Sequence, residues 1–194
     1  MTRTLLFSLM LIPLSTLAQG VAPAQQPNGQ GTKPAEPGVY YKSPTGFVKL
    51  EQIMMAGGGA KHTGKMFVPG LTPQMVYTFR GAHSPIQLSE TKPTFYIRQN
   101  PYMASVPGHS ERDIVIVRFD TKKDHRELQV TSGSSAFTLK SGFSKERTPD
   151  IATTHISDSD FTVIPTQDLV PGEYLLTFGG SGAMGYDFGI PKGK

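Results

Sequence analysis

The segment Leu169-Val170-Pro171-Gly172-Glu173-Tyr174-Leu175-Leu176-Thr177-Phe178 joins a Pro-Gly turn to an alternating apolar run. Tyr174, Leu176 and Phe178 recur at every second position, which is the period of a strand with one buried face. No window of about eleven residues keeps a helical apolar period free of Gly or Pro, so we expect at most a helical turn or two, near Glu51 to Ala56. Similar alternating runs lie at residues 39–42, 47–50, 75–80, 94–98, 127–131 and 161–163.

Many short strands with Gly- and Pro-rich connections predict an all-β sandwich or barrel. The Pro-Gly turn before Tyr174 favours the sandwich, because it resembles the tyrosine corner of immunoglobulin-like and fibronectin-like domains. In that feature the tyrosine hydroxyl bonds to backbone just upstream. An ordinary turn before an inward-facing tyrosine would give the same residues. We expect one antiparallel β-sandwich of this general architecture with little helix, and a structural tyrosine corner at Leu169, Pro171 and Tyr174.

A hairpin is predicted near the start of the folded region. Two alternating runs flank Ser43-Pro44-Thr45-Gly46, in which Pro at the second and Gly at the fourth position favour a type I turn. In a later run, at Glu127 to Thr131, we expect Leu128 and Val130 to face inward.

The first 18 residues have the pattern of a signal peptide. Arg3 precedes an apolar run from residue 5 to 17, and Ala18 offers a small-residue cleavage site, with Ala24 as the second choice. The run is shorter than the roughly 20 residues that span a bilayer. A buried or amphipathic helix is the alternative, which Pro13 disfavours. We therefore expect an exported protein, secreted or periplasmic, without a membrane span.

Composition divides the remaining chain into three parts. Residues 19–37 are rich in Gly, Pro, Ala and Gln and predict a disordered linker. Residues 38–190 regain aromatic and β-branched residues and form the expected domain, followed by a tail at 191–194. The chain has no cysteine, which excludes disulfides, thiolate catalysis and a lipid-bearing cysteine.

The charge pattern does not indicate nucleic-acid binding. Removing Arg3 with the leader leaves 18 basic and 15 acidic residues, a net charge of +3 spread along the chain. Nucleic-acid binders concentrate basic residues on one face or in one run. The densest patch, Lys122 to Arg126, is interrupted by Asp124, and we expect a solvated hairpin tip there.

Two glycine-rich segments match nucleotide-binding motifs, but the residues around them do not fit such sites. No cofactor is therefore expected. Residues 59–65 fit G-x-x-x-x-G-K, but Met66 follows where Ser or Thr would hold Mg²⁺. Residues 180–185 fit G-x-G-x-x-G, but too little chain follows to complete a dinucleotide site. We interpret residues 180–185 as a flexible loop before a short strand at 186–188.

No catalytic or metal motif stands out, so an enzyme is the less favoured class. The five histidines lack the spacing of a metal pair, and Ser157 to Asp160 lacks the Gly and Glu of a Ca²⁺ loop and predicts a solvated turn. Exposed-looking serines occur outside any G-x-S-x-G elbow. A hydrolase remains the alternative, with a residue such as His83, His109 or His155 beside a carboxylate. The five histidines are His62, His83, His109, His125 and His155, and the serines are Ser134, Ser135 and Ser181.

The run from Ile114 to Val117 is continuously apolar. If Val115 and Val117 face the core, Ile114 and Ile116 lie on the opposite face, beside the polar Gln129 of the next strand. These isoleucines need a cover, since monomers rarely expose contiguous apolar patches. The connection from 57 to 70 or from 141 to 156 is one possibility. A partner or ligand is the other, which makes Ile114, Ile116 and Gln129 a possible interaction face.

The order of segments resembles a group of uncharacterised exported bacterial β proteins. This resemblance implies an exported β fold and transfers no functional residue. By elimination, we expect a binding or interaction module whose partner is a protein or glycan, and a structural role in an envelope complex is a further alternative. The resemblance rests on residues 38–41, 93–97, 113–118, 169–174 and 186–189.

Overall fold

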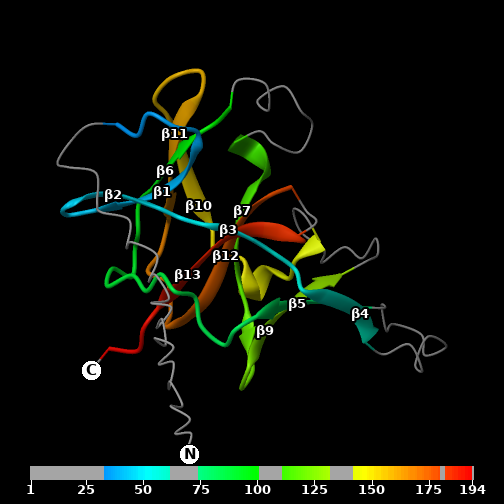
Figure 1. Ribbon diagram of the computed structural model, residues 1–194. Coiled ribbons are helices and arrows are strands. Elements are labelled where there is room, and N and C mark those ends of the chain that lie inside the picture. Colours follow the sequence, from blue (N-terminus) through cyan, green and yellow to red (C-terminus); the bar gives the residue numbers. More distant parts are fainter. Residues whose placement is uncertain (1–32, 62–73, 101–110, 132–141, 180–181, 194) are drawn as a thin grey trace, which may run out of the picture.

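The computed structural model describes residues 33–61, 74–100, 111–131, 142–179 and 182–193 (Figure 1). These residues form an all-β fold of three antiparallel sheets, with no α-helix among them. The helical elements that they contain are two short 3-10 turns, η2 (Glu111–Asp113) and η4 (Lys145–Arg147). Within the described residues, we find no helix with the length and apolar character needed to cross a bilayer.

We name the sheets A, B and C and give their strands in spatial order. Sheet A contains β10 (Ile151–His155), β11 (Asp160–Pro165), β6 (Phe95–Arg98), β1 (Gly38–Ser43) and β2 (Gly46–Lys49). Sheet B contains β3 (Gln52–Met54), β13 (Met184–Ile190), β12 (Gly172–Phe178) and β7 (Ile114–Arg118). Sheet C contains β4 (Gly57–Lys61), β5 (Gln74–Arg80), β9 (His125–Thr131) and β8 (Asp120–Thr121).

The predicted hairpin is confirmed. β1 and β2 pair in antiparallel register with Ser43 opposite Gly46, so that Pro44 and Thr45 form the tip. Leu128 is fully buried and Val130 packs beside it, as the alternation in β9 predicts.

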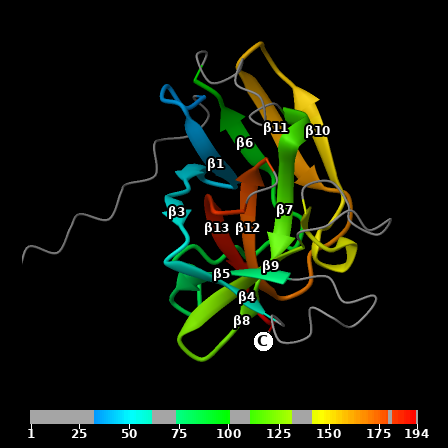
Figure 2. The ribbon, with the colours of Figure 1, turned by 90° about the vertical axis from the view of Figure 1, so that its right-hand side faces the viewer.

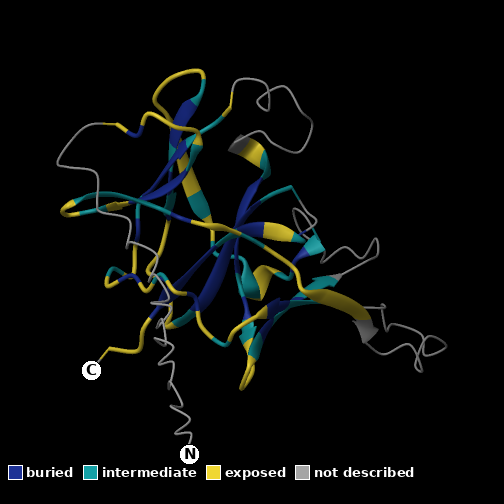
Figure 3. Ribbon diagram, viewed as in Figure 1, coloured by how far each residue is buried: buried dark blue, intermediate teal, exposed yellow. Residues whose placement is uncertain are grey.

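Sheet B is the central layer of the molecule. One face packs on sheet A in a cluster that includes Ile116, Leu176 and Phe188. The opposite face packs on sheet C, where Val117 and Leu175 meet other buried apolar side chains. Figure 2 places the strands of sheet B between those of sheets A and C, and Figure 3 shows the buried residues concentrated there.

This layering corrects our interpretation of the apolar run in β7. Strands buried on both faces are continuously apolar, and β7 contributes Ile114 and Ile116 to one cluster and Val115 and Val117 to the other. The cover over the two isoleucines is sheet A and not either of the connections that we considered. Gln129 lies in sheet C, on β9, and its side chain donates to Asp120 at 3.1 Å. Ile114 and Ile116 are therefore core residues and form no accessible face with Gln129.

The helical turn predicted between Glu51 and Ala56 is wrong. Residues 52–54 form β3, which pairs with β13 at the edge of sheet B. The local pattern there is ambiguous, and pairing with a neighbouring strand decides the structure because it satisfies the backbone groups.

The end of the expected linker is held against the domain. Pro34 is buried, and its carbonyl accepts a short hydrogen bond from the Arg98 guanidinium. The Tyr40 hydroxyl donates to the Glu36 carbonyl at 3.0 Å, and Lys49 pairs with the Glu36 carboxylate at 2.9 Å. Pro34 and Glu36 thus hold this mostly exposed segment to sheet A, so residues 33–37 are not a free tether. The predicted signal peptide and residues 19–32 lie outside the described residues.

The tyrosine corner has its expected hydrogen bond. The buried Tyr174 donates its hydroxyl to the Val170 carbonyl at 2.6 Å, and Leu169 is buried beside it in the core. The Pro171 carbonyl accepts from Arg118 of β7 at 2.8 Å. The turn thereby fixes the entry of β12 into the central sheet.

Candidate functional site

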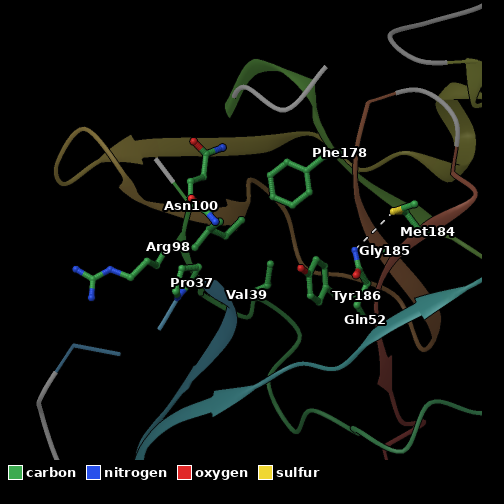
Figure 4. A pocket seen from close by; sticks show the side chains of 12 residues that line it. Pro37, Val39, Gln52, Arg98, Asn100, Phe178, Met184, Gly185 and Tyr186 are labelled. Atoms are coloured by element: carbon green, nitrogen blue, oxygen red, sulfur yellow. Dashed lines mark hydrogen bonds between the residues drawn. The ribbon is translucent and has the colours of Figure 1, made fainter. Parts of the chain in front are cut away.

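A cavity of about 520 Å³ opens at the seam between sheets A and B (Figure 4). It lies where β1 and β13 begin and β6 and β12 end, so the same end of both sheets forms its wall. We call it the seam cavity. Residues that line it are Pro37, Gly38, Val39, Gln52, Ile97, Arg98, Gln99, Asn100, Phe178, Met184, Gly185 and Tyr186.

The walls of the seam cavity are apolar because they continue the core between the two sheets. Val39 and Ile97 belong to the buried cluster, and Phe178 and Tyr186 are partly buried at its margin. Phe178 lies two positions after Leu176 and Tyr186 two before Phe188, so strand alternation directs all four to the same face of sheet B. Figure 4 shows the Phe178 ring close to and above the Tyr186 ring in this view.

Polar groups border the opening. The side chains of Gln52, Gln99 and Asn100 contribute amides to the lining. The Gln52 amide donates to the Met184 sulfur at 3.6 Å, the dashed contact in Figure 4. Side-chain amides carry both donors and acceptors, so this border can recognise hydroxyl and carbonyl groups alike.

Arg98 is the one charged residue among the described residues that line the cavity, and its charge is already paired. Its Nε lies 2.9 Å from Asp160 Oδ1, and Figure 4 shows the guanidinium pointing away from the cavity. Burial disfavours the charged form of Asp160, but hydrogen bonds from Arg98, Tyr96 and Ser157 together outweigh this effect and lower the pKa of the carboxyl. The pair therefore stays ionised at neutral pH and leaves the cavity without a free charge.

Tyr186 presents a neutral hydroxyl. Burial raises its pKa above the ordinary value, and Lys49 offsets only part of this effect. The cavity thus combines apolar walls, side-chain amides and a phenol, a composition typical of sites for small uncharged ligands.

A second polar cluster joins sheets B and C. The buried Arg126 of β9 forms a short ion pair with the buried Asp187 of β13. Its guanidinium also donates to the carbonyls of Arg80 and Gly81, both at 3.1 Å, and lies 5.0 Å from the Phe119 ring centroid. The expected solvated tip at 122–126 is therefore correct for the exposed Lys122, Lys123 and Asp124 but wrong for Arg126.

Glu173 links this cluster to a surface histidine. Its carboxylate accepts from the Ser84 backbone at 2.7 Å and lies 2.9 Å from His83 Nδ1. Glu173 is buried, whereas the His83 side chain is 73% exposed. This is the approach of a histidine and a carboxylate that the hydrolase alternative requires. A second cavity, of about 460 Å³, lies beside Arg126 and Arg80, and His83 lines neither cavity.

The other predicted positions do not converge. His125 pairs with its neighbour Asp124 at 2.7 Å, and His155 lies on the exposed β10. His62, His109, Ser134, Ser135 and Ser181 lie outside the described residues. Within the described ranges, no three His, Cys, Asp or Glu side chains group in a way that could hold a metal ion.

The structure corrects two predicted loops. The expected turn at 157–160 is exposed at Ser157 and Asp158, but Asp160 is buried on β11 with Arg98. β13 begins at Met184, so Gly185 belongs to a strand and not to a flexible loop. A Cβ at Gly185 would lie 2.5 Å from the Leu176 carbonyl, which explains the glycine by close strand approach.

Sequence reasoning missed the seam cavity and the buried charges. Phe178 and Tyr186 are visible as alternating apolar positions, but nothing in the sequence shows that sheet A ends opposite them. For Arg126, the available signal is its position two residues before the inward-facing Leu128, and for Asp187 it is a carboxylate between Tyr186 and Phe188.

The comparisons with protein-family models, with curated proteins and with solved structures found no match.

Proposed function

We propose that this protein is an exported binding module of the β-sandwich class that takes a neutral ligand into the seam cavity. The signal-like residues 1–18 support export. The two buried clusters on opposite faces of sheet B support a sandwich arrangement. The seam cavity is the single observation that carries the proposal.

The size and lining of the seam cavity favour a small ligand. Its volume of about 520 Å³ lies within the range of ordinary ligand pockets. Because Arg98 is paired with Asp160, a charged ligand would gain no counter-charge and would lose its hydration. The ligand is therefore uncharged.

A sugar residue of a glycan is the ligand class that fits best. The C–H face of a sugar can pack on the Phe178 or Tyr186 ring, since aromatic rings supply large flat apolar surfaces. Its hydroxyls both donate and accept, which matches the amides of Gln52, Gln99 and Asn100.

Nuclear magnetic resonance titration of the purified protein tests this proposal. Neutral oligosaccharides should shift backbone resonances of β1, β6, β12 and β13 in a saturable manner. Gln52 is exposed at the rim, so Gln52→Trp should obstruct the opening without unfolding the domain and abolish these shifts. Thr154→Trp places the same bulk on the exposed β10 and serves as the control.

Two results would contradict the proposal. If apolar peptides shift these resonances and oligosaccharides do not, the glycan assignment is wrong. If neither class of ligand perturbs them, the seam cavity is not a ligand site.

A hydrolase is the second candidate, and the His83–Glu173 contact is the observation that favours it. A buried carboxylate at 2.9 Å from Nδ1 orients an imidazole so that Nε2 can act as a base. This candidate requires measurable hydrolysis of ester or glycoside substrates that is lost in His83→Ala. His155→Ala removes an exposed histidine on β10 as the control. Absence of hydrolysis by the unmodified protein would end this candidate.

A further inference from the structure

Two methionines lie directly opposite each other at the exposed edge of sheet B. Met54 of β3 and Met184 of β13 are register partners. The Met55 amide donates to the Ala183 carbonyl at 2.8 Å, which makes residues 55 and 183 a hydrogen-bonded pair. Bonded and non-bonded pairs alternate along antiparallel strands, so Met54 and Met184 form a non-bonded pair. Side chains in non-bonded pairs lie closer together than those in bonded pairs, since their Cα atoms are about 4.5 Å apart.

Both side chains are open to solvent on the same face of the sheet. Met54 is 69% exposed and Met184 is 45% exposed, although large apolar side chains usually gain from burial. The Met184 sulfur accepts the amide of Gln52, which lies on β3 two residues before Met54. In Figure 4 this contact directs the Met184 sulfur toward β3. The register therefore places both thioethers side by side on one face at the edge of sheet B, where Met184 also lines the seam cavity and Met54 the second cavity.

We propose that Met54 and Met184 together form a binding site for a monovalent soft metal ion, Cu(I). Thioethers are soft ligands that select Cu(I) over Mg²⁺, Ca²⁺ and other hard cations. Monovalent copper accepts low coordination numbers, so two converging sulfurs supply its protein ligands. The chain has no cysteine to compete for the ion. This site rests on the methionine pair alone and is independent of the ligand proposed for the seam cavity.

Titration with Ag(I), a redox-stable analogue of Cu(I), tests the site. In protein labelled at the methionine methyl groups, the Met54 and Met184 resonances should shift together and saturate at one equivalent of Ag(I). Met54→Leu and Met184→Leu assign these resonances and keep the side-chain volume. Each single variant should bind at least about tenfold more weakly, and the double variant should lose this site.

Met55→Leu is the matched control. Met55 adjoins Met54 on the same chain segment, is 42% exposed and points to the opposite face of the sheet. The Met55→Leu variant should bind Ag(I) with the affinity of the unmodified protein. The same should hold for Cu(I) under anaerobic reducing conditions. The proposal is overturned if the Met54 and Met184 resonances do not respond to saturating Ag(I). It is equally overturned if the double variant, with an unchanged backbone spectrum, retains the original affinity.

Discussion

At the scale of single residues, the buried Tyr96 and Tyr174 place their hydroxyls in different surroundings. The Tyr174 hydroxyl donates to the Val170 carbonyl, whereas the Tyr96 hydroxyl lies beside the carboxylate of Asp160 and stabilises its charged form. Burial, followed by the interaction with Asp160, raises the pKa of Tyr96 to about 12. We expect Tyr174→Phe to lower the free energy of unfolding by about 1 kcal/mol at any pH, because it removes a buried hydrogen bond. Tyr96→Phe should lower it at neutral pH and less on acidification, since the hydroxyl that it removes favours ionised Asp160. Urea denaturation of both variants at neutral and acidic pH measures this contrast, and a Tyr96→Phe variant more stable than the unmodified protein would contradict it.

The Arg98–Asp160 pair makes a prediction about pH. The pKa of Asp160 is lower in the folded state, since burial raises it but the hydrogen bonds from Arg98, Tyr96 and Ser157 and the Arg98 charge together outweigh burial. The pair therefore stabilises the fold fully above the ordinary Asp pKa of about 3.9 and loses this contribution as the pH falls through the folded value. Asp160→Asn should cost about 1 to 2 kcal/mol at neutral pH, a value reduced by the partial exposure of Arg98. The difference between the two proteins should shrink on acidification, as measured by denaturant titration from pH 7 to pH 3. A difference independent of pH would contradict the ionised pair.

At the scale of elements, a buried ion pair connects sheets B and C, which also share an apolar cluster. Arg126 of β9 and Asp187 of β13 are each 3% exposed and form an ion pair between sheets C and B. Arg126→Met should lower the free energy of unfolding by about 3 to 5 kcal/mol, because it leaves Asp187 buried and uncompensated. The double variant Arg126→Met with Asp187→Leu should recover part of this loss. Thermal unfolding of the three proteins checks the order, and an equal loss in single and double variants would contradict the pairing.

Much of the strand content could be predicted from sequence at this scale. Large apolar or aromatic residues at every second position locate β5, β6, β9 and β12, because successive side chains of a strand point to opposite faces. In β7 the run is continuously apolar, and which residue joins which cluster depends on the packing of distant strands. The seam cavity could not be predicted from the sequence for a similar reason. Its lining comes from five separate strands and the segments that adjoin them, so no local pattern marks it.

At the scale of the whole molecule, sheets A and C each pack on sheet B. Disruption of sheet B removes a wall from both buried clusters, so we expect one cooperative unfolding transition. Amide hydrogen exchange should be slowest in β12, where Leu175, Leu176 and Thr177 are fully buried, and fastest in the exposed edge strand β10. Mass spectrometry of exchanged fragments measures this order. Protection of sheet A that outlasts protection of β12 would contradict the central role of sheet B.

The position of sheet B along the chain has a consequence for biosynthesis. β12 and β13 supply its two inner strands, and both lie after residue 171. In a nascent chain that lacks β12 and β13, sheets A and C are present without the central strands between them. Their apolar faces that contact β12 and β13 then remain exposed to water. Synthesis of β12 and β13 closes both halves at once, so a truncation before Gly172 would leave both buried clusters exposed to water.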